Sequence, residues 1–133
     1  MDTGKADFIV IDDNKVDCFI AEKVIENSGK GESCRVFYQA TQALEYIKEQ
    51  HSSPGATIVF VDIQMPVMNG FQFVDYFERL PLPKQHCFYI YALSSSINQG
   101  DIERIKAFRS VKGFLNKPLT VEMINNVVKA AFL

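Results

Sequence analysis

The 133-residue sequence lacks any apolar run close to the roughly 20 residues that a transmembrane helix requires. Its N-terminal segment reaches Asp12 and Asp13 before it attains the apolar length and small cleavage residues of a signal peptide. It also lacks an excess of basic residues, since the formal net charge is −2, so we expect no direct binding of nucleic acid. These absences predict a cytoplasmic protein that contacts neither membrane nor nucleic acid.

Cysteines are few and form no CxxC pair. The three of them, Cys18, Cys34 and Cys87, are scattered along the chain and odd in number. This pattern favours reduced, mostly buried thiols over disulfides or a zinc site. Neither His51 nor His86 lies in a motif that would partner a catalytic cysteine, so cysteine catalysis is not expected.

Hydrophobic residues, by contrast, make up 47% of the chain, including eleven Phe and five Tyr, which is enough to form the core of one domain over residues 1–133. No effector domain is expected in this chain. Short apolar runs rich in Val, Ile, Phe and Tyr show little alternation, as is typical of strands buried on both faces of a parallel sheet. The predicted strands are Phe8–Ile11, Cys34–Tyr38, Thr57–Val61, Cys87–Leu93 and a weaker Gly113–Leu115.

Segments with helical spacing of apolar residues lie between these runs. The predicted apolar faces consist of Val16, Phe19, Ile20, Val24 and Ile25; Ala43, Leu44 and Ile47; Phe71, Val74 and Phe77; Ile102, Ile105 and Phe108; and Met123, Ile124, Val127 and Val128. The alternation of strands and helices from end to end predicts a doubly wound α/β domain.

Several residues indicate where these helices begin and end. Gly29 is expected to stop the first helix. Thr41 and Thr120 are expected to cap the second and the last helix. Pro81 and Pro83 are expected to terminate the helix that follows Gly70, because proline cannot continue a helix.

Polar and charged residues follow most of the predicted strands. Ligands of a doubly wound sheet bind at the carboxyl ends of its strands, so these residues are expected to gather at one edge. They are Asp12 and Asp13 after the first strand, Asp62 after the third, Ser94 after the fourth and Asn116, Lys117 and Pro118 after the fifth. Taken singly, an Asp after a strand or a Lys-Pro pair is more often a turn, but their shared placement favours a site.

The charges of this predicted cluster indicate its chemistry. Three carboxylates (−3) and Lys117 (+1) leave −2, which is costly in a partly desolvated cleft. A hard divalent cation would neutralise this charge, and Mg²⁺ suits carboxylates, waters and a substrate phosphate. One carboxylate would remain free as a nucleophile, since Asp can form a covalent phosphoryl intermediate.

Four segments of the chain resemble the receiver domains of two-component response regulators. FIVIDDN resembles the family's first strand with its acidic pair, and VDIQMPVMNG resembles its phosphorylation loop with Asp62 at the acceptor position. ALSSS resembles the switch strand, and GFLNKPL the strand that precedes the family's lysine. The resemblance covers nearly the whole chain. It implies a flavodoxin-like, five-stranded parallel sheet in the order 2-1-3-4-5 with helices on both faces, like that of single-domain chemotaxis regulators.

The resemblance also implies roles for the clustered residues. Asp62 would accept a phosphoryl group from a phosphohistidine of a sensor histidine kinase or a histidine phosphotransfer protein. Asp13, Asp62 and the backbone carbonyl of Gln64 would ligate Mg²⁺, and Asp12 would do so through a water. Lys117 would contact the phosphoryl group. The Lys117–Pro118 peptide bond would be cis, a minority state for such bonds.

Further implied roles concern the switch. Ser94 would supply its hydroxyl, although Ser95 and Ser96 follow at once and leave the register open. Phe114 would be the partner aromatic, where many relatives have Tyr, and a plain core Phe is an equal alternative. The face formed by helix four, strand five and helix five would then control a downstream partner or an output domain. Gln64 and Ser96 would flank the path of the hydrolytic water and tune the lifetime of the phosphoryl group.

The resemblance implies a signalling switch that catalyses only its own phosphorylation and dephosphorylation, as a monomer or a weak phosphorylation-dependent dimer. An aspartate-nucleophile phosphatase of the haloacid-dehalogenase type would need an acid at Gln64, which cannot transfer a proton usefully. A flavodoxin-like flavin carrier is disfavoured because Asp12, Asp13 and Asn14 would repel its phosphate. A receiver fold that acts as an interaction module without phosphorylation stays open.

Overall fold

The computed structural model describes residues 4–50, 56–96 and 98–132, which form a five-stranded sheet in the order β2-β1-β3-β4-β5. All neighbouring strands are parallel, so the predicted doubly wound topology and strand order are confirmed. The strands are β1 (Ala6–Ile11), β2 (Gly31–Phe37), β3 (Thr57–Asp62), β4 (Phe88–Ser94) and β5 (Val111–Asn116).

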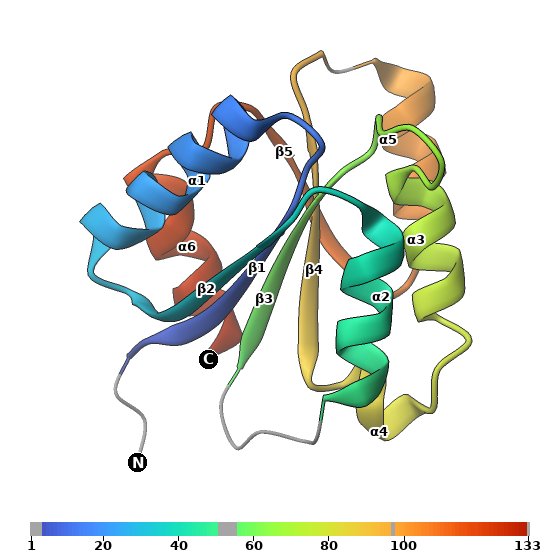
Figure 1. The fold of residues 1–133 in the computed structure, drawn as a ribbon, viewed down its shortest axis with the longest axis horizontal. Coiled ribbons are helices and arrows are strands. Elements are labelled where there is room, and N and C mark those ends of the chain that lie inside the picture. The colour runs from blue at the N-terminus through green and yellow to red at the C-terminus, as the bar shows by residue number, and fades with distance from the viewer. Residues whose placement is uncertain (1–3, 51–55, 97, 133) are drawn as a thin grey trace.

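Helices cover both faces of this sheet (Figure 1). Helices α1 and α6 pack against one face, whereas α2, α3 and α5 pack against the other. The helices are α1 (Lys15–Ser28), α2 (Ala40–Glu49), α3 (Gly70–Phe77), α4 (Leu82–Gln85), α5 (Gln99–Lys106) and α6 (Val121–Ala131). Among the described residues, none of these helices is long and apolar enough to cross a bilayer.

The central strands distribute their side chains to two separate cores. In β1, Phe8 and Val10 join the cluster beneath α1 and α6, whereas Ile9 and Ile11 join the cluster beneath α2 and α3. Successive side chains of a strand point to opposite faces, and both faces are covered, so the runs show no polar alternation. The prediction of burial on both faces is wrong for the edge strands β2 and β5, in which no residue is fully buried, because each has a neighbouring strand on one side only.

The apolar face predicted for the first helix is wrong for Val16, Phe19 and Ile20, whereas Ile25 is buried and Val24 packs against the same core. Helix α1 buries Cys18, Ala21 and Ile25, whereas Val16 and Phe19 are 66% and 58% exposed. The small side chains of Cys18 and Ala21 face the sheet and allow the helix to lie close to it. The bulky residues therefore point outward, and Ile20 also remains exposed.

The predicted helix ends are confirmed in part. Gly29 ends α1 in the left-handed conformation, with φ 70°, and its N–H donates to the Glu26 carbonyl. The Thr120 hydroxyl accepts from the Met123 N–H at 3.2 Å and caps α6, as predicted. Thr41 is not a cap, because α2 begins one residue earlier at Ala40, after Gln39.

The prolines have a different role from the one predicted. Helix α3 ends at Phe77, well before Pro81, and Pro81 instead precedes the additional short helix α4. Pro83 lies in the first turn of α4, where proline is tolerated because its missing N–H would have no partner within the helix. Phe108 lies beyond the end of α5, although it packs against the same cluster as Ile105.

The three cysteines are free thiols, with Cys18 buried and Cys34 and Cys87 half-buried. Burial raises the pKa of the Cys18 and Cys34 thiols to about 12, so both are protonated and unreactive near neutral pH. His51 lies outside the described residues.

Candidate functional site

Three carboxylates meet at the carboxyl edge of the sheet. Asp12 and Asp13 directly follow β1, and Asp62 is the last residue of the neighbouring β3. One carboxylate oxygen from each lies within 4.8 Å of those of the other two. Asp12 and Asp62 are buried and Asp13 is exposed, so the cluster opens to solvent on the side of Asp13.

Lys117 reaches into this cluster from the end of β5. Its backbone N–H donates to the Ser94 carbonyl at 2.8 Å, which continues the pairing of β4 with β5 by one residue. Its ammonium Nζ lies 2.6 Å from Asp12 Oδ2 and 2.8 Å from Asp62 Oδ2. The Lys117–Pro118 peptide bond is cis, the state that the resemblance implied.

The ionisation of the cluster follows from these contacts. Burial alone would lower the pKa of Lys117, but hydrogen bonds to carboxylates outweigh it and hold that pKa above its ordinary value. The pKa of Asp12 is raised, chiefly by burial and further by the negative charge of Asp62, although the hydrogen bond from Lys117 opposes this. The site therefore holds a charged lysine among carboxylates that it neutralises only in part.

The loop after β3 is fixed by close backbone contacts. The Gln64 N–H donates to Asp62 Oδ1 at 2.8 Å, which orients the carboxylate. A Cβ on Gly70 would lie 2.7 Å from the Asp62 carbonyl oxygen, so only glycine allows this approach. Val67 has a positive φ of 69°, which is strained for a β-branched residue, and its side chain is 88% exposed.

The three serines after the fourth strand differ in position. Ser94 is the last residue of β4 and is buried, whereas Ser95 and Ser96 are exposed. The Ser94 hydroxyl donates to the Ser96 carbonyl at 2.6 Å and accepts from the Ser96 N–H at 3.1 Å. Phe114 is half-buried against the small cluster beneath α5, which includes Ile105.

Two residues of this region were missed by the sequence analysis. Asp17 in the first turn of α1 lies 2.9 Å from Lys117 Nζ and is a third carboxylate partner of that lysine. Asn14 caps α1 by accepting from the Asp17 N–H at 3.0 Å. A signal was present, because Asn14 is a favoured cap, and side chains in a first turn lean back toward the sheet edge.

The donor set fits a hard divalent cation. Carboxylate oxygens from Asp12, Asp13 and Asp62 converge at one opening, and Lys117 offsets only one of their negative charges. Oxygen ligands of this kind suit Mg²⁺, which retains several waters. The same arrangement places Asp62 Oδ2 beside the positive charge of Lys117, which can stabilise a negatively charged group that an Asp nucleophile attacks.

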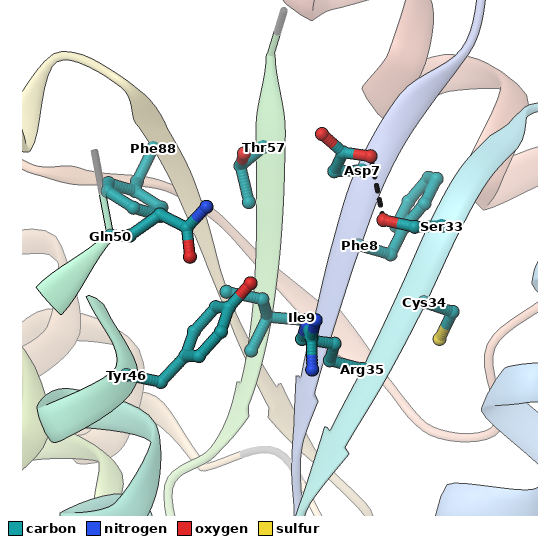
Figure 2. A pocket seen from close by; sticks show the side chains of 10 residues that line it. All are labelled: Asp7, Phe8, Ile9, Ser33, Cys34, Arg35, Tyr46, Gln50, Thr57 and Phe88. Atoms are coloured by element: carbon teal, nitrogen blue, oxygen red, sulfur yellow. Dashed lines mark hydrogen bonds between the residues drawn. The ribbon is translucent and has the colours of Figure 1, made fainter. Parts of the chain in front are cut away.

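The opposite end of the sheet has a different character. A hollow of about 350 Å³ lies at the amino ends of the strands, and some of the polar side chains that line it contact one another (Figure 2). Asp7 accepts from the Ser33 hydroxyl at 2.7 Å, and the Arg35 guanidinium lies 4.8 Å from the centre of the Tyr46 ring. Neither of these two contacts places a carboxylate beside a positively charged side chain, as Lys117 and Asp62 are placed at the other end.

Fold and site together define a doubly wound α/β domain with a lysine-bridged acidic cleft at its carboxyl edge. A family model described as the response regulator receiver domain matches residues 8–129. The chain therefore belongs to the response regulator receiver domain family of two-component systems. A search of curated proteins found no match.

Solved structures of receiver proteins are similar over almost the whole chain. A response regulator receiver protein from Dyadobacter fermentans is 31% identical, with a TM-score of 0.88, and the match covers 96% of this chain and 98% of that one. A two-component response regulator from Cytophaga hutchinsonii is 25% identical, with the same TM-score and coverage. The receiver domain of a Pseudomonas aeruginosa sensor histidine kinase, which has magnesium in its active-site cleft, is 17% identical. Its TM-score is 0.75, and the match covers 96% of this chain and 97% of that one, which shows a shared fold.

Proposed function

We propose that this receiver domain accepts a phosphoryl group onto Asp62 from a phosphohistidine of a sensor histidine kinase or a histidine phosphotransfer protein. One observation carries the proposal: the Asp62 carboxylate lies 2.8 Å from the Lys117 ammonium in a cleft shared with Asp12 and Asp13. The phosphoryl group is negatively charged, so its transfer to Asp62 needs positive charge nearby. Lys117 supplies one such charge, and a cation held by the neighbouring carboxylates would supply another.

In this proposal Asp13, Asp62 and the backbone carbonyl of Gln64 hold Mg²⁺, and Asp12 acts through a water. The convergence of the three carboxylates supports this assignment, as does the magnesium in the cleft of the Pseudomonas aeruginosa receiver domain. When bound, Mg²⁺ neutralises phosphoryl oxygens as negative charge develops on them. Lys117 provides the second positive charge for these oxygens.

The chemical step follows from the carboxylate. An Asp62 oxygen attacks the phosphorus of the phosphohistidine, and the phosphorus–nitrogen bond breaks. The electron pair of that bond stays on the imidazole nitrogen, which takes up a proton, and an acyl phosphate forms on Asp62. The hydrogen bond from the Gln64 N–H to the other Asp62 oxygen orients the carboxylate for this attack.

The proposed switch starts from the present contacts of Ser94. Its hydroxyl is engaged by the Ser96 backbone, and in the proposal it leaves that contact for the phosphoryl oxygens. Ser96 would move with it, and Phe114 would repack against the cluster beneath α5. The fourth and fifth predicted helices correspond to α5 and α6, because the short α4 is additional. The face formed by α5, β5 and α6 then controls a downstream protein or an output domain.

The exposed apolar residues of α1 are suited to the phosphodonor protein. Val16, Phe19 and Ile20 point outward, and Ile20 lines a small hollow together with Lys117 and Pro118. A protein that brings a phosphohistidine to Asp62 has to approach the opening of the acidic cleft. Helix α1 begins beside that opening, so its exposed face is available for contact with this protein. We propose that it buries these three side chains.

Two polar side chains are proposed to tune hydrolysis. Gln64 and Ser96 are both exposed in loops that border the cleft. Exchanging Gln64 for Ala is expected to change the rate of dephosphorylation, and an unchanged rate would remove Gln64 from the proposal. A cytoplasmic location, a monomeric or weakly dimeric state and a single receiver domain over 1–133 stay predictions.

Phosphorylation by a small donor tests the proposal directly. We expect incubation with acetyl phosphate and Mg²⁺ to add one phosphoryl group in intact-mass spectra, and Asp62→Asn to abolish the gain. Binding of beryllofluoride that requires Mg²⁺ would support the same site independently. No gain in mass would instead favour an interaction module that acts without phosphorylation. A gain that persists in Asp62→Asn would contradict Asp62 as the phosphoacceptor.

A further inference from the structure

We propose that Asp17 is a positioning residue that holds the Lys117 ammonium in place for phosphoryl transfer to Asp62. This inference rests on the proposed phosphorylation of Asp62. The Asp17 carboxylate lies 2.9 Å from Lys117 Nζ and joins the first turn of α1 to the end of β5. Asp17 lies outside the four segments of the chain that resemble receiver domains.

The hydrogen bonds of the ammonium show why a third carboxylate matters. A lysine ammonium has three N–H donors, and Lys117 directs them at Asp12, Asp62 and Asp17. Asp12 and Asp62 belong to the group that could hold a metal, and Asp17 does not. When a metal binds and Asp62 becomes an acyl phosphate, Asp12 and Asp62 both change partners. Asp17 is the acceptor whose role stays the same.

Asp17 is well placed to act as such a fixed partner. Its backbone N–H donates to the Asn14 cap at 3.0 Å, which fixes the first turn of α1. Lys117 has a flexible four-carbon side chain, and a restraint from a rigid helix limits the positions of its ammonium. Without Asp17, the ammonium would pair with Asp12 and Asp62 alone and compete there with a metal and with the phosphoryl group.

A second role of Asp17 has to be separated from this one. A carboxylate in the first turn of a helix also stabilises that helix through its interaction with the helix dipole. That role changes the stability of the fold and leaves the Lys117 ammonium and the rate of phosphoryl transfer unaltered. The two roles therefore differ in two measurable quantities.

The experiment compares Asp17→Ala, which removes the acceptor, with Asp17→Asn, which keeps an acceptor oxygen without the charge. Glu22→Gln is the matched control, since Glu22 is exposed on the same helix and its exchange alters the net charge equally. Phosphorylation by acetyl phosphate with Mg²⁺ is followed by intact mass. The Lys117 Nζ signal is followed by NMR of protein labelled with ¹⁵N-lysine and assigned by its absence in Lys117→Arg.

We expect Asp17→Ala to slow phosphorylation by about tenfold, as a misplaced catalytic group does. We also expect its Lys117 Nζ signal to broaden, because the ammonium then exchanges with water. Asp17→Asn should retain most of the rate, and Glu22→Gln should match the wild type. If Asp17→Ala does not fold, Asp17→Ser, whose hydroxyl is one bond shorter than the carboxylate, takes its place with the same expectation.

A wild-type rate or a faster one in folded Asp17→Ala, or an unchanged Lys117 signal, would overturn the inference. The outcome is distinct from failure of the proposed function. A wild-type protein that takes up no phosphate would contradict the proposed function, whereas the Lys117 signal would still report whether Asp17 restrains the ammonium.

Discussion

The two ends of the sheet differ in how their charged side chains are placed, although the same strands form both ends. At the carboxyl end, Asp12 and Asp62 are buried beside Lys117, and like charges lie close together. At the amino end, Asp7 pairs with a neutral hydroxyl, and Lys112 lies exposed over the Tyr89 ring. Repulsion among the carboxylates at the carboxyl end therefore lowers the stability of the fold. Such an arrangement is expected where a cation and a phosphoryl group bind.

Lys112 near the start of β5 and Lys117 directly after its end provide the strongest contrast. Lys117→Met would leave three carboxylates without their common partner, and we expect it to lower the free energy of unfolding by roughly 3 kcal/mol. Lys112→Met at the amino end is the control, with an expected loss of about 0.5 kcal/mol or less. Urea unfolding measures both. Equal losses of unfolding free energy in the two variants would contradict the proposed electrostatic difference between the two ends of the sheet.

The dependence of stability on pH follows from the same lysine. Contacts with carboxylates hold the pKa of Lys117 above its ordinary value of 10.5. Its contribution to stability is therefore complete below pH 10.5 and is lost as the pH rises through the higher folded-state pKa. Lys117→Met should lack this part of the decline, which comparison of the two alkaline unfolding profiles would reveal.

Close approach of the backbone makes Gly70 the next most sensitive position. A Cβ there would lie 2.7 Å from the Asp62 carbonyl oxygen and from Ile63 Cα, both of which are backbone atoms. We expect Gly70→Ala to lower the free energy of unfolding by about 2 kcal/mol. Gly100→Ala, in α5, meets only the Asn98 side chain at 3.4 Å and should be neutral or stabilising. A tolerated Gly70→Ala would show that the loop after β3 is not tightly packed.

Strain at Val67 predicts a change of the opposite sign. Its φ of 69° is unfavourable for a β-branched side chain, whereas Asn adopts such a conformation more readily. We expect Val67→Asn to raise the free energy of unfolding by about 1 kcal/mol. Thermal unfolding measures this change, and a loss of stability would mean that the exposed Val67 side chain contributes a contact of its own.

Repulsion among the carboxylates predicts the smallest effect. Asp13→Asn removes one like charge from the cluster, so we expect a gain of roughly 0.5 kcal/mol in the absence of Mg²⁺. Asp7→Asn at the amino end, which weakens the bond from Ser33, should bring a slight loss. Addition of Mg²⁺ should raise the unfolding temperature of the wild type and leave that of Asp13→Asn unchanged. Equal responses to Mg²⁺ would place the metal elsewhere.

The sequence predicted the sheet and most of the acidic cleft for a simple reason. Asp12, Asp13, Asp62 and Lys117 each follow an apolar run, and the carboxyl ends of parallel strands meet at one edge. These positions depend only on the order of the elements along the chain. Ser94 could be placed at the same edge on the same basis, as the end of β4.

The outward face of α1 could not be predicted in this way. Spacing alone allowed a face with Val16, Phe19 and Ile20 or one with Cys18 and Ala21, and hydrophobicity favoured the first. Packing against the sheet and α6 selected the second, because small side chains let the helix lie closer. Such a choice depends on contacts between elements that are distant in the sequence.

Asp17 escaped prediction for the same reason, since its partner Lys117 is 100 residues away in the sequence. The short helix α4 was missed because Pro81 and Pro83 were interpreted only as helix terminators. Proline stops a helix in its interior but is favoured in its first turn. Which role applies is decided by the chain that follows, here the turn that leads into β4.

The most direct test of the central claim is to locate the phosphoryl group. After incubation with acetyl phosphate, reduction with borohydride would mark the acyl phosphate, and mass spectrometry of proteolytic fragments would identify the modified residue. We predict modification at Asp62 alone, and only when Mg²⁺ is present. A mark at Asp12 or Asp13, or none on the fully folded protein, would contradict the assignment of Asp62 as the phosphoacceptor.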